Sequence, residues 1–96
     1  MKKAGRANEA DWFEEIPNVG KRVANDFKKL GFKTPEDLKG KNPYKLYDTL
    51  CKKDGVRHDP CLLDTFIAAI HFMNGGKPTP WWKFTPERKK KTSTHL

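Results

Sequence analysis

Several features are missing from this sequence, and their absence narrows the classes of protein to which it can belong. No apolar run approaches the roughly 18 residues that a helix needs to cross a bilayer. The first residues, Met1-Lys2-Lys3, are followed by polar residues and not by the apolar core of a secretory signal. We therefore expect a cytoplasmic protein that does not act at a membrane.

Catalytic motifs are also absent. The sequence contains no HExxH motif, no P-loop, no recognisable pair of nucleophile and base, and no paired carboxylates. No segment alternates apolar and polar residues as a half-buried strand does. We expect a protein without enzymatic activity and without a cofactor.

Cysteine is scarce, and its two positions leave three alternatives open. Cys51, His58 and Cys61 have the spacing Cys-x6-His-x2-Cys, and Asp54 or His71 can supply a fourth metal ligand. Structural zinc sites usually contain at least one closely spaced cysteine pair, which this chain lacks. Two cysteines on adjoining helices of a cytosolic protein are more often small core residues, or occasionally a redox pair. We expect both thiols to be reduced, buried and metal-free.

The net charge of +8 on 96 residues is unevenly distributed. Residues 1–15 carry −1, residues 16–34 carry +4, residues 35–76 balance to zero and residues 77–96 add +5. Charge that only kept the protein in solution would be spread along the chain. Two basic segments favour a polyanionic partner instead.

Helix start and stop signals predict five short helices, so we expect an all-α fold of one small domain. An N-cap at Asn8 and an acidic first turn indicate a helix over about 9–15. The others are expected at about 20–30, 34–40, 43–53 and 61–73, and the last three follow a Thr-Pro, Asn-Pro or Asp-Pro start signal. The last helix is apolar almost all the way round, which predicts a buried, central position.

Both ends of the chain are expected to lie outside the packed domain. Residues 1–7 are predicted to be a disordered leader, residues 8–84 the domain, and residues 85–96 a basic disordered tail. Because proline blocks a long helix, Trp81 and Trp82 are expected on an extended segment. They either fold back to cap the core or stack on the bases of single-stranded nucleic acid.

The segment 16–32, IPNVGKRVANDFKKLGF, contains a tight turn at Asn18-Val19-Gly20 followed by an apolar helix face. The first N–H groups of such a helix have no partner within the helix, and the helix dipole makes this end mildly positive, so it can hold a phosphate. Lys21 and Arg22 occupy the first turn, where the dipole alone favours acidic residues. We expect these two cations to face an anion.

This segment resembles the helix-hairpin-helix motif, in which apolar-Pro-Gly-apolar-Gly is followed by a basic and a small residue. The matching positions are Ile16, Pro17, Val19, Gly20, Lys21 and Ala24. Asn18 stands where the first glycine is expected, and asparagine tolerates a positive φ better than other non-glycine residues. The resemblance implies binding to the nucleic-acid backbone without sequence preference.

A second, degenerate hairpin is expected at Gly55, Arg57 and His58. Two such units joined by the connector at 34–40 resemble the double helix-hairpin-helix (SAM-like) fold. The order of hairpin, DLKG at 37–40, LYDTLCKKDGVRHDPC at 46–61, buried helix and Trp-Trp pair also resembles a small bacterial family known as pathogenicity-locus or mitomycin-resistance proteins. Such labels name a genetic context, so the hairpin carries the expected mechanism.

Sequence-independent binding to the DNA backbone, single- or double-stranded, is the function that we expect, with DNA repair or recombination as the process it suggests. The contacts are assigned to Asn18, Val19, Gly20, Lys21, Arg22, Lys28 and Lys29. The alternative is a protein-protein interaction module that docks through the hairpin or through the Trp-Trp segment. Salt separates the two alternatives, because phosphate binding weakens steeply as salt is added.

Overall fold

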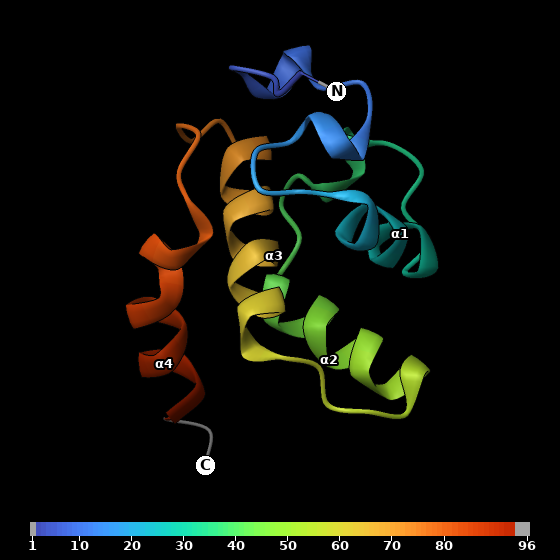
Figure 1. Cartoon of the computed structure of the whole chain (residues 1–96), viewed down its shortest axis with the longest axis vertical. Helices are drawn as coiled ribbons and strands as arrows, with labels where there is room; N and C mark the ends of the chain where they lie inside the picture. The colour runs from blue at the N-terminus through green and yellow to red at the C-terminus, as the bar shows by residue number, and fades with distance from the viewer. Residues whose placement is uncertain (1, 94–96) are drawn as a thin grey trace.

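In the computed structural model, which describes residues 2–93, helices and turns make up the fold and no strand occurs among those residues. The described residues form four α-helices and four short 3-10 helices (Figure 1). The elements follow in the order η1 (Ala7–Glu9), η2 (Phe13–Glu15), α1 (Lys21–Lys29), η3 (Pro35–Leu38), α2 (Pro43–Asp54), α3 (Pro60–Met73), η4 (Trp81–Phe84) and α4 (Thr85–Ser93). The predicted all-α class is confirmed. Three of the five expected helices are found as α1, α2 and α3, the connector at 34–40 is the 3-10 helix η3, and α4 lies where no helix was expected.

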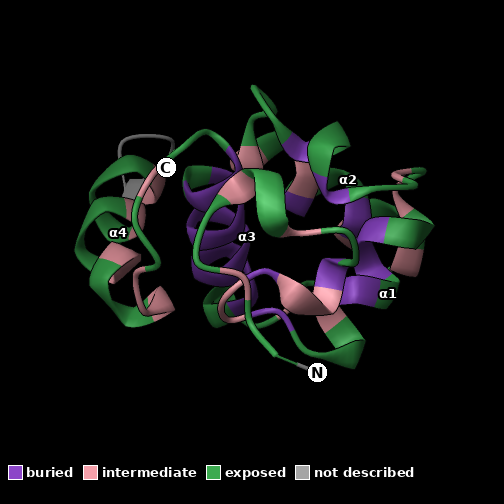
Figure 2. Ribbon diagram, turned by 90° about the horizontal axis from the view of Figure 1, so that it is seen from above, coloured by how far each residue is buried: buried purple, intermediate pink, exposed green. Residues whose placement is uncertain are grey.

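Helix α3 is the centre of the molecule, as its apolar sequence predicted. It packs against α2 and α4 and against three of the 3-10 helices, η1, η3 and η4. All of its residues from Leu62 to Ile70 are buried, as are Phe72 and Met73, and Figure 2 shows burial along nearly the whole helix. The other elements are therefore arranged around one buried helix, with α4 on one side and α1 and α2 on the other.

Phe27 joins α1 to this centre. Its fully buried ring lies 5.1 Å from the ring of Phe66 in α3 and 5.4 Å from the ring of Phe13 in η2. Tilted contacts between aromatic rings at such distances are favourable beyond the apolar area that they bury. The packing of Phe27 therefore fixes α1, including its first turn, against the core.

The local start signals are confirmed where proline follows a capping residue. The Asn42 side chain accepts from the backbone N–H of Tyr44 at 2.9 Å, and Asp59 accepts from the N–H of Cys61 at 2.8 Å. At the connector, the Asp37 carboxylate accepts from the N–H groups of Lys33 and Thr34, and these bonds lower the pKa of Asp37. Each cap satisfies N–H groups that the helix itself leaves unpaired.

The N-terminal segment differs from the prediction. The expected helix over 9–15 with Asn8 as its N-cap is replaced by two separate 3-10 helices, and Asn8 lies inside the first of them. The carboxylates of Glu9 and Glu15 each accept two nearby backbone N–H groups, which closes two short turns and not one continuous helix. The described part of the leader is also ordered, because the N–H of Ala4 donates to the carbonyl of Glu15 at 2.8 Å.

The C-terminal segment differs as well. The tryptophans lie on η4 and not on an extended segment, and α4 continues to Ser93 where a disordered tail was expected. Pro86 is the second residue of α4, a position at which its missing N–H costs no intrahelical bond. Residues 94–96 of the predicted tail, and Met1 of the leader, lie outside the described residues.

Candidate nucleic-acid interface

The turn at residues 16–20 adopts the conformation that its sequence predicted. Asn18 has φ of 74°, the only positive φ of a non-glycine residue in the described chain. The N–H of Val19 donates to the carbonyl of Ile16 at 3.1 Å, and both side chains are fully buried. The two apolar residues anchor the turn, while Gly20 remains exposed at its outer end.

Gly20 leads directly into α1, and no side chain caps this helix. The first intrahelical bond runs from the N–H of Ala24 to the carbonyl of Gly20 at 3.0 Å, so the N–H groups of residues 21–23 precede it. A Cβ placed on Gly20 would meet no atom within 4 Å, so the space in front of the turn is open. An anion can approach these N–H groups without displacing any described side chain.

Lys3 adds a cation to this turn that the sequence analysis had assigned to a disordered leader. Its ammonium group donates to the carbonyl oxygens of Glu14 at 2.7 Å and Val19 at 2.6 Å. Partial burial lowers the pKa of Lys3, and the charge of Glu14 opposes that shift. No local sequence pattern identified Lys3, because its partners lie more than ten residues away.

The predicted basic residues of α1 fall into two groups. Lys21 and Lys28 are exposed, and because they are seven residues apart they share one face of the helix. Arg22 and Lys29 instead bond to other side chains of the protein. Arg22 donates to Nδ1 of His58 at 3.2 Å and lies 3.9 Å from Asp26, and Lys29 donates to Asp54 at 2.9 Å.

These contacts connect α1 to the end of α2 and to the loop that follows it. Nε2 of His58 lies 2.7 Å from Asp54. The Asp54 carboxylate is therefore hydrogen-bonded to both Lys29 and His58, and these bonds lower the pKa of Asp54. Asp26, whose carboxylate lies near Arg22, is only 4 % exposed, and one of its carboxylate oxygens has no hydrogen-bond partner. Burial raises the pKa of Asp26 against the opposing effect of Arg22 and Lys29.

The predicted second hairpin lies beside the first turn of α1, because His58 is the partner of Arg22. Gly55 ends α2 with φ of 68°, and the hydroxyl of Tyr47 donates to the carbonyl of His58 and holds the loop. Burial raises the pKa of Tyr47 to about 12. Unlike α1, α3 begins with a carboxylate, Asp59, which already accepts from the backbone N–H of Cys61, so the two turns differ in the charge at the helix end.

The comparisons with known proteins can be placed against this geometry. Residues 6–90 match the pathogenicity locus family (Cdd1), and that range includes the turn, the four α-helices as far as residue 90 and the Trp-Trp pair. The chain belongs to this family. A relative, the mitomycin resistance protein McrB of Streptomyces lavendulae, is 41 % identical over 75 residues, which cover 78 % of this chain and 71 % of the relative. No solved structure matches the chain.

In this pathogenicity locus protein the turn at residues 16–20 is hydrogen-bonded to the segment that carries the Trp-Trp pair. The side-chain amide of Asn18 donates to the carbonyl of Thr79 at 2.7 Å, and its oxygen accepts from the N–H of Trp81 at 3.3 Å. Trp81 is half-buried, whereas Trp82 is 57 % exposed and its ring meets that of Trp81 edge to face. The residue that departs from the usual hairpin pattern thus has a structural partner that its sequence position did not predict.

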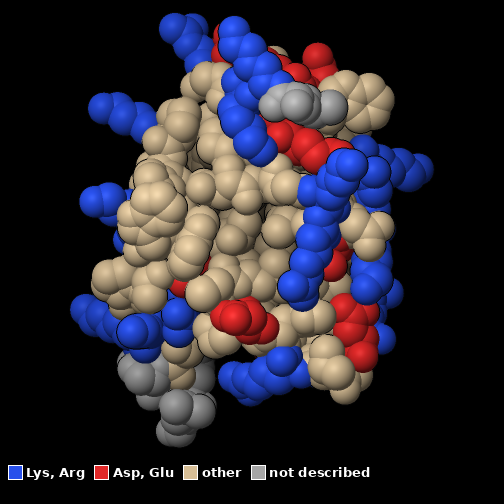
Figure 3. Space-filling model, viewed as in Figure 1, with Lys and Arg blue, Asp and Glu red and all other residues tan. Residues whose placement is uncertain are grey.

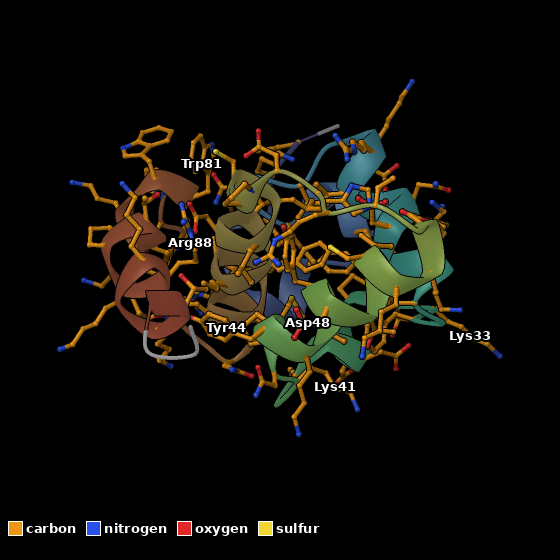
Figure 4. The ribbon with its side chains drawn as sticks, turned by 90° about the horizontal axis from the view of Figure 1, so that it is seen from below. Lys33, Lys41, Tyr44, Asp48, Trp81 and Arg88 are labelled. Carbon is orange, nitrogen blue, oxygen red and sulfur yellow. The ribbon has the colours of Figure 1, made fainter. Side chains whose placement is uncertain are left out.

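Helix α4 is attached to α3 through Asp64, which is fully buried. Arg88 donates to Asp64 from Nε at 2.9 Å, and the hydroxyl of Thr85 donates to the other carboxylate oxygen at 2.7 Å. Arg88 projects from α4 toward α3 in Figure 4. In the sequence, the feature that indicates the Asp64–Arg88 pair is a single aspartate on an otherwise apolar helix. A buried carboxylate there needs a cation and hydrogen bonds.

Basic side chains are visible on both sides of one face of the molecule, and the surface between them is largely uncharged with a few acidic side chains (Figure 3). The distribution follows from the two basic segments of the sequence, because α1 and α4 lie on opposite sides of α3 (Figure 1). No helix within residues 2–93 is both long enough and apolar enough to cross a membrane.

The cysteines are not buried, contrary to the prediction from the sequence. Both are free, but Cys51 is only half-buried and Cys61 is exposed in the first turn of α3, before its buried stretch begins. A hydrogen bond with Asp59 raises the pKa of the Cys61 thiol. Within the described range, no group of three or more His, Cys, Asp and Glu side chains is arranged to hold a metal ion. His71 lies at the exposed rim of α3, with its ring 5.3 Å from that of Phe84.

Proposed function

We propose that this pathogenicity locus protein is a non-enzymatic, helix-hairpin-helix DNA-binding protein that holds the phosphate backbone without reading the base sequence. The observation that carries the proposal is the uncapped start of α1 behind Gly20, with open space in front of it and Lys21 beside it. Backbone N–H groups and a helix dipole recognise a phosphate oxygen but not a base edge. DNA repair or recombination is the process that such binding suggests, and no cofactor is needed for it.

Three cations are available to a bound phosphate backbone. Lys21 and Lys28 lie on one exposed face of α1, and Arg22 can exchange His58 for a phosphate because its side chain is 67 % exposed. Lys29 is less available, since its ammonium group bonds to Asp54. About three neutralised phosphates give a salt slope near −2.7, so raising salt from about 50 to 200 mM should weaken binding roughly 40-fold.

The second hairpin is a weaker candidate for a phosphate site. Arg57 is exposed, but the Asp59 carboxylate at the start of α3 opposes an anion there. In the double helix-hairpin-helix (SAM-like) arrangement that we propose, this loop supports the first hairpin through His58 and contributes Arg57 at its edge.

Fluorescence anisotropy with labelled duplexes of two unrelated sequences tests the proposal. We expect equal affinities for both sequences and a salt slope that falls by about two units in Lys21→Ala/Lys28→Ala. The matched control is Lys41→Ala/Lys45→Ala, which removes the same charge from exposed positions at the start of α2. Equal losses in both double variants would show that only net charge attracts the DNA, and absence of binding at low salt would leave the interaction module as the better function.

That module is the second candidate, and exposed apolar side chains favour it. Trp12 is 65 % exposed, Val56 55 % and Trp82 57 %. A protein partner docked on such side chains would bind with little dependence on salt. The salt titration described above therefore decides between the two functions.

A further inference from the structure

Trp82 is a large apolar side chain that is exposed on a well-fixed backbone. The turn that carries it is held at its start by the bond from the Trp81 N–H to Asn18, and within itself by the bond from the Lys83 N–H to Pro80. At its end the turn runs into α4, where Thr85 and Arg88 both bond to the buried Asp64. The backbone around Trp82 is therefore ordered before any ligand binds.

The indole of Trp82 is also held by its neighbour. Its ring meets that of Trp81 edge to face, with centroids 5.7 Å apart and planes at 86°. Trp81 is half-buried, so it acts as a fixed support for a ring that is itself 57 % exposed. An aromatic surface that is already ordered loses little conformational entropy on binding a flat partner.

The surrounding charge indicates the chemistry of that partner. Lys77 and Lys83 are exposed on either side of the tryptophan pair, and the segment 77–91 has six basic residues and one acidic residue, although one of the basic residues, Arg88, is paired with Asp64. The cores of protein-protein interfaces are depleted in lysine, whereas sites for single-stranded nucleic acid combine aromatic rings with a basic surface. Charge complementarity thus favours a nucleic-acid strand over an apolar protein surface.

The aromatic pair and the turn at 16–20 form one connected unit. Asn18 is two residues from Gly20 and its side chain bonds directly to the backbone of Trp81. A strand whose phosphate lies at the start of α1 therefore passes close to the tryptophan pair. In a continuous duplex the bases are stacked inside the helix, and they reach a protein ring only after unstacking, which costs free energy.

We propose that Trp82 stacks on an unpaired base of the DNA strand whose phosphate the hairpin holds, so that the protein prefers DNA with unpaired bases to a continuous duplex. This inference rests on the proposed DNA binding and adds the class of DNA. Asn18 is the positioning residue that sets the aromatic ring relative to the hairpin.

The test compares a blunt duplex with the same duplex carrying a single-stranded tail of about ten thymidines, a length within the range of known single-strand sites. Affinities are measured by anisotropy, and quenching of tryptophan fluorescence reports stacking directly. Trp82→Ala should weaken binding to the tailed DNA about tenfold, should leave blunt-duplex binding unchanged, and should lose most of the quenching. Trp82→Phe should restore part of the tailed-DNA affinity, because it retains an aromatic face.

Trp12→Ala is the matched control, since it removes an equally exposed indole from the segment before η2. It should change neither affinity by more than about twofold, as expected for a surface substitution. If Trp82→Ala binds the tailed DNA as tightly as the wild type, or if Trp12→Ala weakens it equally, the stacking inference is overturned while duplex binding by the hairpin stands. If the wild-type protein binds neither DNA at low salt, the proposed function fails, and the stacking inference fails with it.

Discussion

Arg22 in α1 donates a hydrogen bond to Nδ1 of His58, at 3.2 Å, across the gap between α1 and the loop before α3. A guanidinium group can only donate, so Nδ1 accepts and the proton of the neutral ring lies on Nε2, where it faces Asp54 at 2.7 Å. The imidazole thus fixes Arg22 in place and connects it to the carboxylate that also holds Lys29. Two of the predicted DNA contacts, Arg22 and Lys29, are therefore already hydrogen-bonded within the protein.

The first prediction concerns the release of Arg22. In His58→Ala the guanidinium loses its acceptor and no longer gives up a hydrogen bond when it pairs with a phosphate, so DNA binding should tighten about fivefold at each salt concentration while the salt slope stays at about −2.7. Anisotropy titrations at several salt concentrations measure the affinity and the slope, with His71→Ala as a histidine variant outside this group. An unchanged affinity in His58→Ala would mean that His58 does not compete with a phosphate for Arg22.

The second prediction separates the backbone of Asn18 from its side chain. Asn18→Gly removes two hydrogen bonds and should lower the free energy of unfolding by about 1–2 kcal/mol. Asn18→Ala loses the same bonds and also places a Cβ at φ of 74°, which should cost about 1 kcal/mol more. Urea denaturation measures both variants, and the exposed Asn25→Ala in α1 should stay within about 0.5 kcal/mol of the wild type. Equal stabilities of the glycine and alanine variants would contradict the strained turn.

The third prediction concerns the buried pair of Asp64 and Arg88. Arg88→Ala leaves a carboxylate in the core without its cation, and should destabilise the protein by about 3 kcal/mol and unfold α4. Replacing both partners, as in Asp64→Leu/Arg88→Met, should recover most of that loss because no charge then remains buried. Thermal unfolding followed by circular dichroism measures the effect. The exposed neighbour Lys89→Ala should change little, and a comparable loss there would indicate that α4 is held by its surface and not by Asp64.

The fourth prediction concerns the pH dependence of stability at Asp26. Burial raises the pKa of this carboxyl above 3.8 in the folded state, so the folded protein binds its proton more tightly than the unfolded chain does. At neutral pH the carboxyl is charged in both states, and its burial in the folded state lowers the free energy of unfolding by the full amount. This loss of stability disappears as the pH falls below the pKa that the carboxyl has in the unfolded chain. Asp26→Asn should be more stable than the wild type at pH 7, and the difference should vanish toward pH 3. Asp48→Asn, at an exposed position of α2, should show no such trend; denaturation curves across this pH range decide the matter.

Local signals in the sequence predicted most of the helices. The start of α2 follows from Asn42 and Pro43, and the start of α3 from Asp59 and Pro60, because each cap involves residues only two or three positions apart. The positive φ of Asn18 was likewise a local inference from the turn pattern. The apolar sequence of α3 predicted its burial because a helix without a polar face has no side to turn toward water.

The remaining features depend on residues that are distant in the sequence. Lys3 reaches Val19, 16 residues away, and Arg88 reaches Asp64, 24 residues away. No hydrophobic periodicity or capping rule specifies such partners. These long-range hydrogen bonds are the reason that both described ends of the chain are ordered. The same limitation applies to Arg22, whose charge suggested a free phosphate contact before its bond to His58 was visible.

The bonds from Asn18 to Thr79 and Trp81 also bear on the order in which the protein folds. They join residues 61 and 63 positions apart, and the entropy of closing a chain segment rises with its length. Helical proteins that fold fastest rely mainly on contacts between near neighbours. Helix α1 can form early, but the turn in front of it acquires its final side-chain partners only when the segment around residue 80 has docked. Completion of the turn at residues 16–20 is therefore coupled to the docking of the C-terminal third of the chain.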